Sequence, residues 1–274
     1  MSTEKAIIDH YTRGDLKTTI LDVVRQTAAD PAKLTIDDLA AYDEFHIGGR
    51  RATEYFMAML KLTPDTDVLD VGCGIGGAVR FSAQIYNTRT TGIDLTPEFI
   101  TTAETLTDIV SLQDRVNFKV ASATALPFED NTFDTAFTIH AAMNIEDKLG
   151  MYREAARVLK PGAVFGIYDI MAGAPDGVLD FPMPWSTHPE TSFLITPDEV
   201  VSLLSDAGFE VTYREDRRDF ARETFKRMVD DKDSPAGKLQ QSLRKADMPQ
   251  KKANLVRQVE QGRCSPYIII CKKI

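Results

Sequence analysis

The stretch LDVGCGIGG, residues 69 to 77, decides the fold of this chain. It begins in a short apolar, β-branched run that predicts a buried strand at 68–72. The segment AVRFSAQIY follows it, and its apolar residues recur at helical intervals. Four glycines between strand and helix allow the backbone amides to approach a ligand, because no Cβ stands in the way. The stretch therefore predicts a strand, a ligand-binding loop and a helix in succession.

The chain beyond this loop alternates between strand-like and helix-like patterns. Further strands are expected at 90–94, 116–120, 133–139, 163–171, 209–216 and 265–273. Helices are expected from Pro97 to about 109, from 146 to 159, and after a capping box at Thr196–Glu199, with Gly208 as the stop of the last one. This alternation predicts an α/β fold, a doubly wound parallel sheet covered by helices on both faces.

The segments outside the alternation are expected to cover one domain. Residues 1–64 are mostly helical in pattern, with interruptions around DPAKLT and FHIGGR, and the core spans 65–274. We expect two inserts in the core to cover the substrate, at about 172–195 and 219–264. The second insert is largely helical in pattern, with a break at DDKDSPAG.

Composition and charge exclude several classes of protein. The formal net charge of −9 argues against a nucleic-acid partner, and the most basic stretch, KKANLVR at 251–257, is interpreted as the solvated side of a helix. No apolar run is long enough for a membrane span, and the charged first residues do not resemble a secretory signal. The three cysteines lack metal-ligand spacing, so we expect no metal, no disulfide framework and a cytoplasmic protein.

Two acids near the glycine loop bear on the identity of its ligand. The spacing Gly72-x-Gly74-x-x-Gly77 fits both the nicotinamide-nucleotide fingerprint and the loop that binds S-adenosylmethionine. Asp94 ends the next strand, where either cofactor needs a carboxylate for its ribose. Asp70 lies inside the first strand, where it would repel a pyrophosphate but attract an ammonium or sulfonium group. Its alternative role is a hydrogen bond from a local backbone amide.

The motifs together resemble the class I S-adenosylmethionine-dependent methyltransferases. The resemblance rests on VLDVGCGIGG (68–77), GID (92–94), ALPFEDNTFD (125–134) and YREAARVLKPG (152–162), which occur in the expected order over about residues 65–217. It implies a seven-stranded Rossmann-like sheet whose last strand is antiparallel. It also implies S-adenosylmethionine as the cofactor.

The resemblance further implies which residues contact the cofactor. The backbone of the glycine loop would border the methionine part, with Asp70 near the ammonium, Asp94 at the ribose and Leu95 against the adenine. Many relatives carry an acid after the third strand to accept from the adenine amino group. This chain has Ser122 there, so Ser122 and the Ala123 amide imply a weaker contact. The loop residues concerned are Gly72, Cys73, Gly74 and Gly76.

Candidates for the methyl acceptor's site follow the fourth and fifth strands. His140 would face the cofactor, contacting its methionine part or serving as a base, although a structural histidine is an equal alternative. Asn144 either binds the acceptor or caps the next helix, and the cap is favoured. Tyr168 and Asp169 are expected to leave the fifth strand, where Asp169 either balances a cationic substrate or forms a turn.

Two further candidates lie in the covering segments. Trp185, the only tryptophan, is expected to form a wall of the acceptor pocket or to pack against the C-terminal helices. The segment YDEFHIGGRRATEYF (42–56) makes His46 a candidate, because in similar small-molecule methyltransferases a comparable segment folds over the cofactor.

These features predict a methyltransferase that acts on a small molecule. The likeness to sarcosine/dimethylglycine-type and phosphoethanolamine methyltransferases favours an amine nitrogen as acceptor, and an O- or C-methyltransferase of a natural product or quinone-like metabolite is the alternative. An NAD-dependent oxidoreductase and a non-catalytic S-adenosylmethionine-binding protein are more remote hypotheses. We expect a small-molecule partner, no nucleic acid and no membrane, with a homodimer as a possible assembly.

Overall fold

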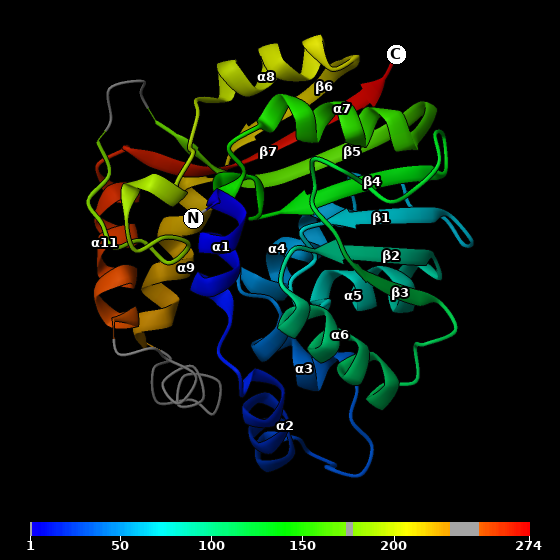
Figure 1. Ribbon diagram of the computed structural model, residues 1–274. Coiled ribbons are helices and arrows are strands. Elements are labelled where there is room, and N and C mark those ends of the chain that lie inside the picture. The colour runs from blue at the N-terminus through cyan, green and yellow to red at the C-terminus, as the bar shows by residue number, and fades with distance from the viewer. Residues whose placement is uncertain (1, 174–177, 231–246) are drawn as a thin grey trace.

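A single sheet of seven strands organises the molecule (Figure 1). The computed structural model describes residues 2–173, 178–230 and 247–274. The strand order is β3-β2-β1-β4-β5-β7-β6. The strands are β1 (Asp67–Val71), β2 (Arg89–Asp94), β3 (Val116–Val120), β4 (Phe133–Ile139), β5 (Leu159–Ala172), β6 (Phe209–Asp216) and β7 (Cys264–Lys273).

The direction of the last strand confirms the fold that the motifs imply. β1 pairs in parallel with β2 and β4, and β4 pairs in parallel with β5. β7 lies between β5 and β6 and is antiparallel to both. The chain order reverses between β1 and β4, which makes the carboxyl ends of these strands a switch point where ligands bind in doubly wound sheets.

Helices cover both faces of the sheet, as the continuous apolar runs of the central strands require. One face packs against α4 (Gly49–Met57) and α5 (Gly77–Tyr86), with Phe56 and Val79 fully buried. The other face packs against α7 (Lys148–Val158) and α8 (Pro197–Asp206), with Met151 and Leu204 fully buried. α6 (Pro97–Ile109) lies beside β3.

The remaining helices come from the two ends of the chain. α2 (Leu16–Thr27) and α3 (Ile36–Asp43) pack on α6 and α5, respectively. α1 (Thr3–Tyr11) lies near the carboxyl ends of the strands, and α9 (Arg218–Asp230) and α11 (Met248–Glu260) pack together beside β7 (Figure 1). None of the described helices is long and apolar enough to cross a membrane.

A buried ion pair joins the N-terminal helices to the sheet domain. The Arg80 guanidinium in α5 donates to Asp43 Oδ2 at 2.8 Å and to the carbonyl of Ile75 at 2.7 Å. It also donates to Ala103 and Thr107 of α6. Both charged side chains are almost fully buried. The pair therefore fixes the end of α3 against the glycine loop.

Local sequence signals located most boundaries within one or two residues. The capping box is present, since Thr196 and Glu199 exchange their hydrogen bonds, and Gly208 has the positive φ of +89° that a helix stop requires. β5, however, begins four residues before and ends one residue after the expected strand at 163–171, and Tyr168 and Asp169 lie inside it. Most of the expected break at DDKDSPAG falls outside the described residues.

The interpretation of 251–257 as a solvated face was wrong for part of the helix. Lys251 and Asn254 in α11 are 1% and 5% exposed, because this side of the helix faces inward.

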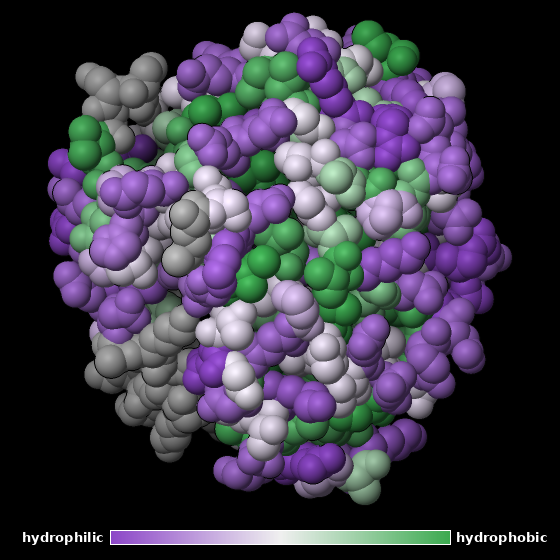
Figure 2. All heavy atoms as spheres, in the orientation of Figure 1, coloured by the Kyte–Doolittle hydropathy of each residue, from purple (hydrophilic) through white to green (hydrophobic). Residues whose placement is uncertain are grey.

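Figure 2 shows a largely hydrophilic surface on which hydrophobic side chains appear near the middle, beside the position of α1 in Figure 1.

Candidate functional site

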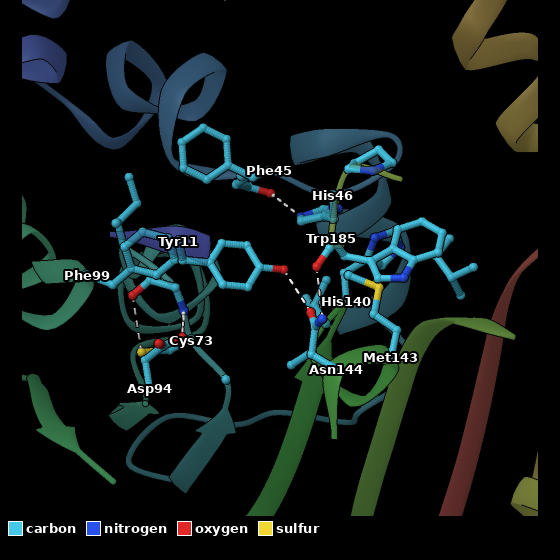
Figure 3. Close-up of a pocket in the computed structure, with 18 of the residues that line it drawn as sticks. Tyr11, Phe45, His46, Cys73, Asp94, Phe99, His140, Met143, Asn144 and Trp185 are labelled. Carbon is cyan, nitrogen blue, oxygen red and sulfur yellow. Dashed lines mark hydrogen bonds and ion pairs between the residues drawn. The ribbon is translucent and has the colours of Figure 1, made fainter. Parts of the chain in front are cut away.

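A large cavity lies at the carboxyl ends of the central strands. Its volume is about 1230 Å³, above the range of about 300–1,000 Å³ typical of small-molecule pockets. It is lined by the loops after β1, β2 and β4, by α1, by the segment between α3 and α4, and by α9 and α11. Figure 3 shows Cys73, Asp94 and Phe99 on one side of this space, and His46, His140 and Trp185 on the other. We call these sides the glycine-loop half and the histidine half.

The glycine loop lines its half of the cavity with backbone. Gly72 and Gly74 have φ values of +83° and +54°, which favour glycine. A Cβ on Gly72 would lie 2.3 Å from the Cβ of Ala141, so the close approach of two loops also requires glycine there. Cys73 lines the cavity as well, whereas Gly76 does not and instead precedes the first residue of α5.

Two carboxylates lie beside this loop. Asp70 is 2% exposed, and its Oδ1 has no hydrogen-bond partner. Burial, together with the nearby charge of Asp94, raises the pKa of Asp70 well above its usual range. Asp94 accepts from the Gly74 amide at 3.0 Å and from the Thr96 amide at 2.8 Å, and burial raises its pKa as well. No local amide pairs with Asp70 Oδ1, which leaves this oxygen available to a bound cation.

The remaining residues expected at the cofactor also border the cavity. Leu95, Ser122 and Ala123 are in its lining. The Ser122 hydroxyl donates to Glu4 Oε1 of α1 at 2.7 Å, so it already has a partner from the N-terminal helix. This contact joins β3's loop to α1.

His46 belongs to a hydrogen-bonded group that local sequence patterns did not predict. Its Nε2 lies 3.2 Å from Glu44 Oε2, and the hydroxyl of Thr53 donates to the same carboxylate. Arg50 Nε donates to Glu44 Oε1 at 2.5 Å. Although burial acts in the opposite direction, His46 and Arg50 hold the pKa of Glu44 below its usual range. An ionised Glu44 holds the proton of His46 on Nε2, and Nδ1 is buried without a partner.

His140 lies beside His46 at the end of β4. The two rings are 5.7 Å apart, and the Nε2 of His140 is buried without a partner. Burial, with His46 as the next cause, lowers the pKa of His140 well below its usual value, so the ring is neutral. Tyr168 packs against both rings, but its hydroxyl donates to the carbonyl of Ile47 at 2.8 Å and it does not line the cavity.

Asn144 joins α1 to the segment between β5 and α8 that contains Trp185 and Thr191, which we call the covering segment. Its Nδ2 donates to the carbonyls of Trp185 and Thr191, both at 2.9 Å, and its Oδ1 accepts from the Tyr11 hydroxyl at 2.8 Å. Figure 3 shows the Tyr11 side chain extending from the glycine-loop half toward Asn144. The expectation that Asn144 caps the next helix was wrong, because Asp147 caps α7 through Gly150.

Trp185 lies between the cavity and the C-terminal helix α11. It lines the cavity and also packs in an apolar cluster with Leu255 and Val259 of α11. Its Nε1 donates to Ser192 at 2.9 Å. Asp169, in contrast, does not line the cavity. It accepts from the amides of Met143 and Ile170, so the structure places it under the histidine half as a support.

A methyltransferase-domain family matches residues 69–167 of the chain. Phosphoethanolamine N-methyltransferase 3 of Arabidopsis thaliana is 34% identical over 188 residues, which are 67% of this chain and 36% of that protein. The chain spans about a third of the length of the curated relatives that it matches.

Two solved structures illustrate the likeness of the fold. Phosphoethanolamine N-methyltransferase 2 of Haemonchus contortus, in complex with phosphomonomethylethanolamine and S-adenosylhomocysteine, has a TM-score of 0.74 at 18% identity, over 93% of this chain and 60% of that one. Geranyl diphosphate C-methyltransferase of Streptomyces coelicolor A3(2) has a TM-score of 0.72 at 14% identity, over 100% and 99%.

Proposed function

We propose that this chain, which belongs to the class I S-adenosylmethionine-dependent methyltransferases, transfers a methyl group from S-adenosylmethionine to a small molecule bound in the histidine half of the cavity. The observation that carries the proposal is the buried, unpaired Oδ1 of Asp70 beside a glycine loop. A buried carboxylate without a partner is costly, and a ligand with a positive charge removes that cost.

The glycine-loop half fits the cofactor. Asp70 would accept from the α-ammonium group, and the bare backbone at Gly72 and Gly74 would adjoin the methionine part. Asp94 would accept from the ribose hydroxyls, because the amides of Gly74 and Thr96 hold its carboxylate at the end of β2 and a carboxylate oxygen can accept more than one hydrogen bond. Leu95, Ser122 and Ala123 border the adenine in this arrangement, with Ser122 shared with Glu4.

The histidine half supplies the groups for an acceptor. S-adenosylmethionine provides an electrophilic methyl group, and positioning an acceptor in line with it accounts for much of the acceleration. His46 is the general base of the proposal, because Glu44 orients the ring and Nδ1 remains able to accept a proton. His140 stays neutral beside it and packs against the bound molecules. Trp185 forms a wall, and Asn144 holds the covering segment to α1.

An amine nitrogen is the first acceptor atom to test, because the relative in Arabidopsis thaliana is named as an N-methyltransferase. A carbon acceptor is the second candidate, since another relative is named as a cycloartenol C-24-methyltransferase, and an oxygen acceptor is the third. A screen of amines, phenols and polyketide-like acceptors for release of S-adenosylhomocysteine distinguishes these classes.

Calorimetric titration with S-adenosylmethionine, S-adenosylhomocysteine and NAD tests the cofactor directly. We expect both sulfur nucleotides to bind and NAD not to bind. If neither S-adenosylmethionine nor S-adenosylhomocysteine bound at millimolar concentration, the proposed function would be overturned.

Replacement of Asp94 tests its role at the ribose. Asp94→Ala should weaken binding of S-adenosylhomocysteine by about 1–3 kcal/mol, because it removes charge-assisted hydrogen bonds. Asp67→Ala is a matched control, since this acid begins the neighbouring strand β1 and pairs with Arg89 away from the cavity. An unchanged dissociation constant for Asp94→Ala would contradict the assignment.

A further inference from the structure

The C-terminal wall of the histidine half contains a buried lysine. Lys251, in α11, is 1% exposed and lines the cavity. Its ammonium lies 3.0 Å from Oδ2 of Asp247, the residue just before the first turn of α11. Unlike the buried side chain of Lys251, the side chain of Asp247 is 37% exposed to solvent. Lys251 therefore lies inside the site, whereas Asp247 lies at the protein surface beside it.

Most of the side chains that line the wall around Lys251 are apolar, and Thr224 and Lys252 are the polar ones on α9 and α11. Leu255, one turn further along α11, is 8% exposed, and Trp185 of the covering segment is 2% exposed. The other apolar side chains that line this part of the cavity are Met143, Ile170, Phe225, Met248 and Val256. A molecule bound here would contact hydrocarbon and aromatic surface over most of its area.

A single carboxylate does not satisfy this ammonium. A lysine has three N–H donors, and Asp247 Oδ2 is the one acceptor that the described residues supply. A buried ammonium is costly unless its remaining donors are also bound. Anionic oxygens of a ligand in the cavity would bind these donors and offset the desolvation free energy of the ammonium.

These observations lead to a substrate class. We propose that the methyl acceptor has a largely apolar skeleton with one anionic group, a carboxylate or a phosphate, and that Lys251 binds this group. The proposal rests on the proposed methyl transfer, since it concerns the acceptor of the same site. It places the anion at α11 and leaves the acceptor atom for His46, which comes from the segment before α4.

The test uses four probes with the same ten-carbon chain: decanoate, decyl phosphate, decanol and decylamine. Each is titrated into the protein by calorimetry, with and without saturating S-adenosylhomocysteine. We expect at least one anion to bind about tenfold more tightly than decanol and decylamine, because a charged hydrogen bond in a buried site is stronger than a neutral one. The comparison of the two anions identifies the carboxylate or the phosphate as the preferred group.

Variants then assign the preference to one residue. Lys251→Met keeps the length of the side chain and removes the charge, so we expect the anions to bind no more tightly than decanol. Lys251→Arg should retain the anion preference. Lys226→Met is the matched control, because Lys226 is an exposed lysine of the neighbouring helix α9, and it should behave like the unaltered protein.

Equal binding of decanol and both anions by the unaltered protein would overturn the inference, whether or not Lys251→Met folds. An anion preference that persists in Lys251→Met would overturn it as well. S-adenosylhomocysteine is titrated in the same preparations. If it binds and no anion preference is found, only the substrate class fails; if it does not bind, the proposed methyl transfer fails, and the titrations without it still decide the anion preference.

Discussion

The two halves of the cavity differ in how their residues are brought together. The glycine-loop half takes its acids and its bare backbone mainly from residues 70–95, within one strand–helix–strand unit. The histidine half takes its side chains from segments spread between residues 45 and 256. The first half carries the carboxylates of Asp70 and Asp94, whereas the second combines the Glu44–His46 pair, the imidazole of His140, apolar surface and the ammonium of Lys251.

The difference shows that one half of the site is specified by a local sequence motif and the other by side chains from segments far apart in the sequence. A cofactor shared by many enzymes is bound by a short unit whose spacing is set by backbone geometry. The acceptor is bound by side chains of covering segments, which vary without disturbing the sheet. Three substitutions test how independent the two halves are.

The largest expected effect comes from the ion pair that fixes the end of α3 against the glycine-loop half. Arg80→Met should lower the free energy of unfolding by about 3–5 kcal/mol, because it leaves Asp43 as a buried charge without its partner. Urea denaturation followed by circular dichroism measures this change. Arg89→Met removes a half-exposed pair with Asp67 and should lower the free energy of unfolding far less, because water screens this pair. Equal effects of the two substitutions would show that the Arg80 pair does not stabilise the junction.

An intermediate effect is expected from the acid of the glycine-loop half. Asp70→Asn should weaken binding of S-adenosylmethionine by about 1.5–3 kcal/mol, through loss of a charged acceptor, and should stabilise the free protein at pH 7. The raised pKa of Asp70 means that its carboxyl favours the folded state when protonated. That contribution is complete below the unfolded pKa of about 3.9 and is lost as the pH rises through the folded value.

Thermal unfolding between pH 4 and 8 measures this prediction. The unaltered protein should lose stability relative to Asp70→Asn as the pH rises, and the addition of S-adenosylmethionine should reverse the order. A variant that is less stable than the unaltered protein at every pH would show that Asp70 has a structural role.

The smallest effect is expected where α1 meets the histidine half. Tyr11→Phe removes the hydrogen bond to Asn144 Oδ1 and should weaken the docking of α1 by about 0.5–1.5 kcal/mol. Hydrogen exchange of the α1 amides should become faster, while the amides of β1 and β4 remain protected. Tyr213→Phe, which removes an exposed bond to Glu215, is the control. Unchanged exchange in α1 would mean that this bond does not hold the helix.

Local signals predicted the elements well because each acts over a few residues. The capping box at Thr196, the stop at Gly208 and the β-branched runs act within one turn or one strand. The same signals did not predict that Glu44 pairs with His46. The two residues are only two positions apart, but many acids near histidines in sequence face solvent. These signals also assigned Lys251 to a solvated face, since the spacing of α11 does not reveal that a second helix and a covering segment pack against it.

The sequence alone determined the sheet, the glycine loop and the pair Asp70 and Asp94, because these depend on backbone conformation and on residues fixed in one local unit. Only the tertiary structure decided that Asp70 Oδ1 lacks a partner, that Asn144 joins α1 to the covering segment, and that Lys251 lies inside the cavity. These facts depend on burial and on contacts between segments far apart in the chain. Such contacts arise from the packing of whole elements, and no local pattern of residues encodes them.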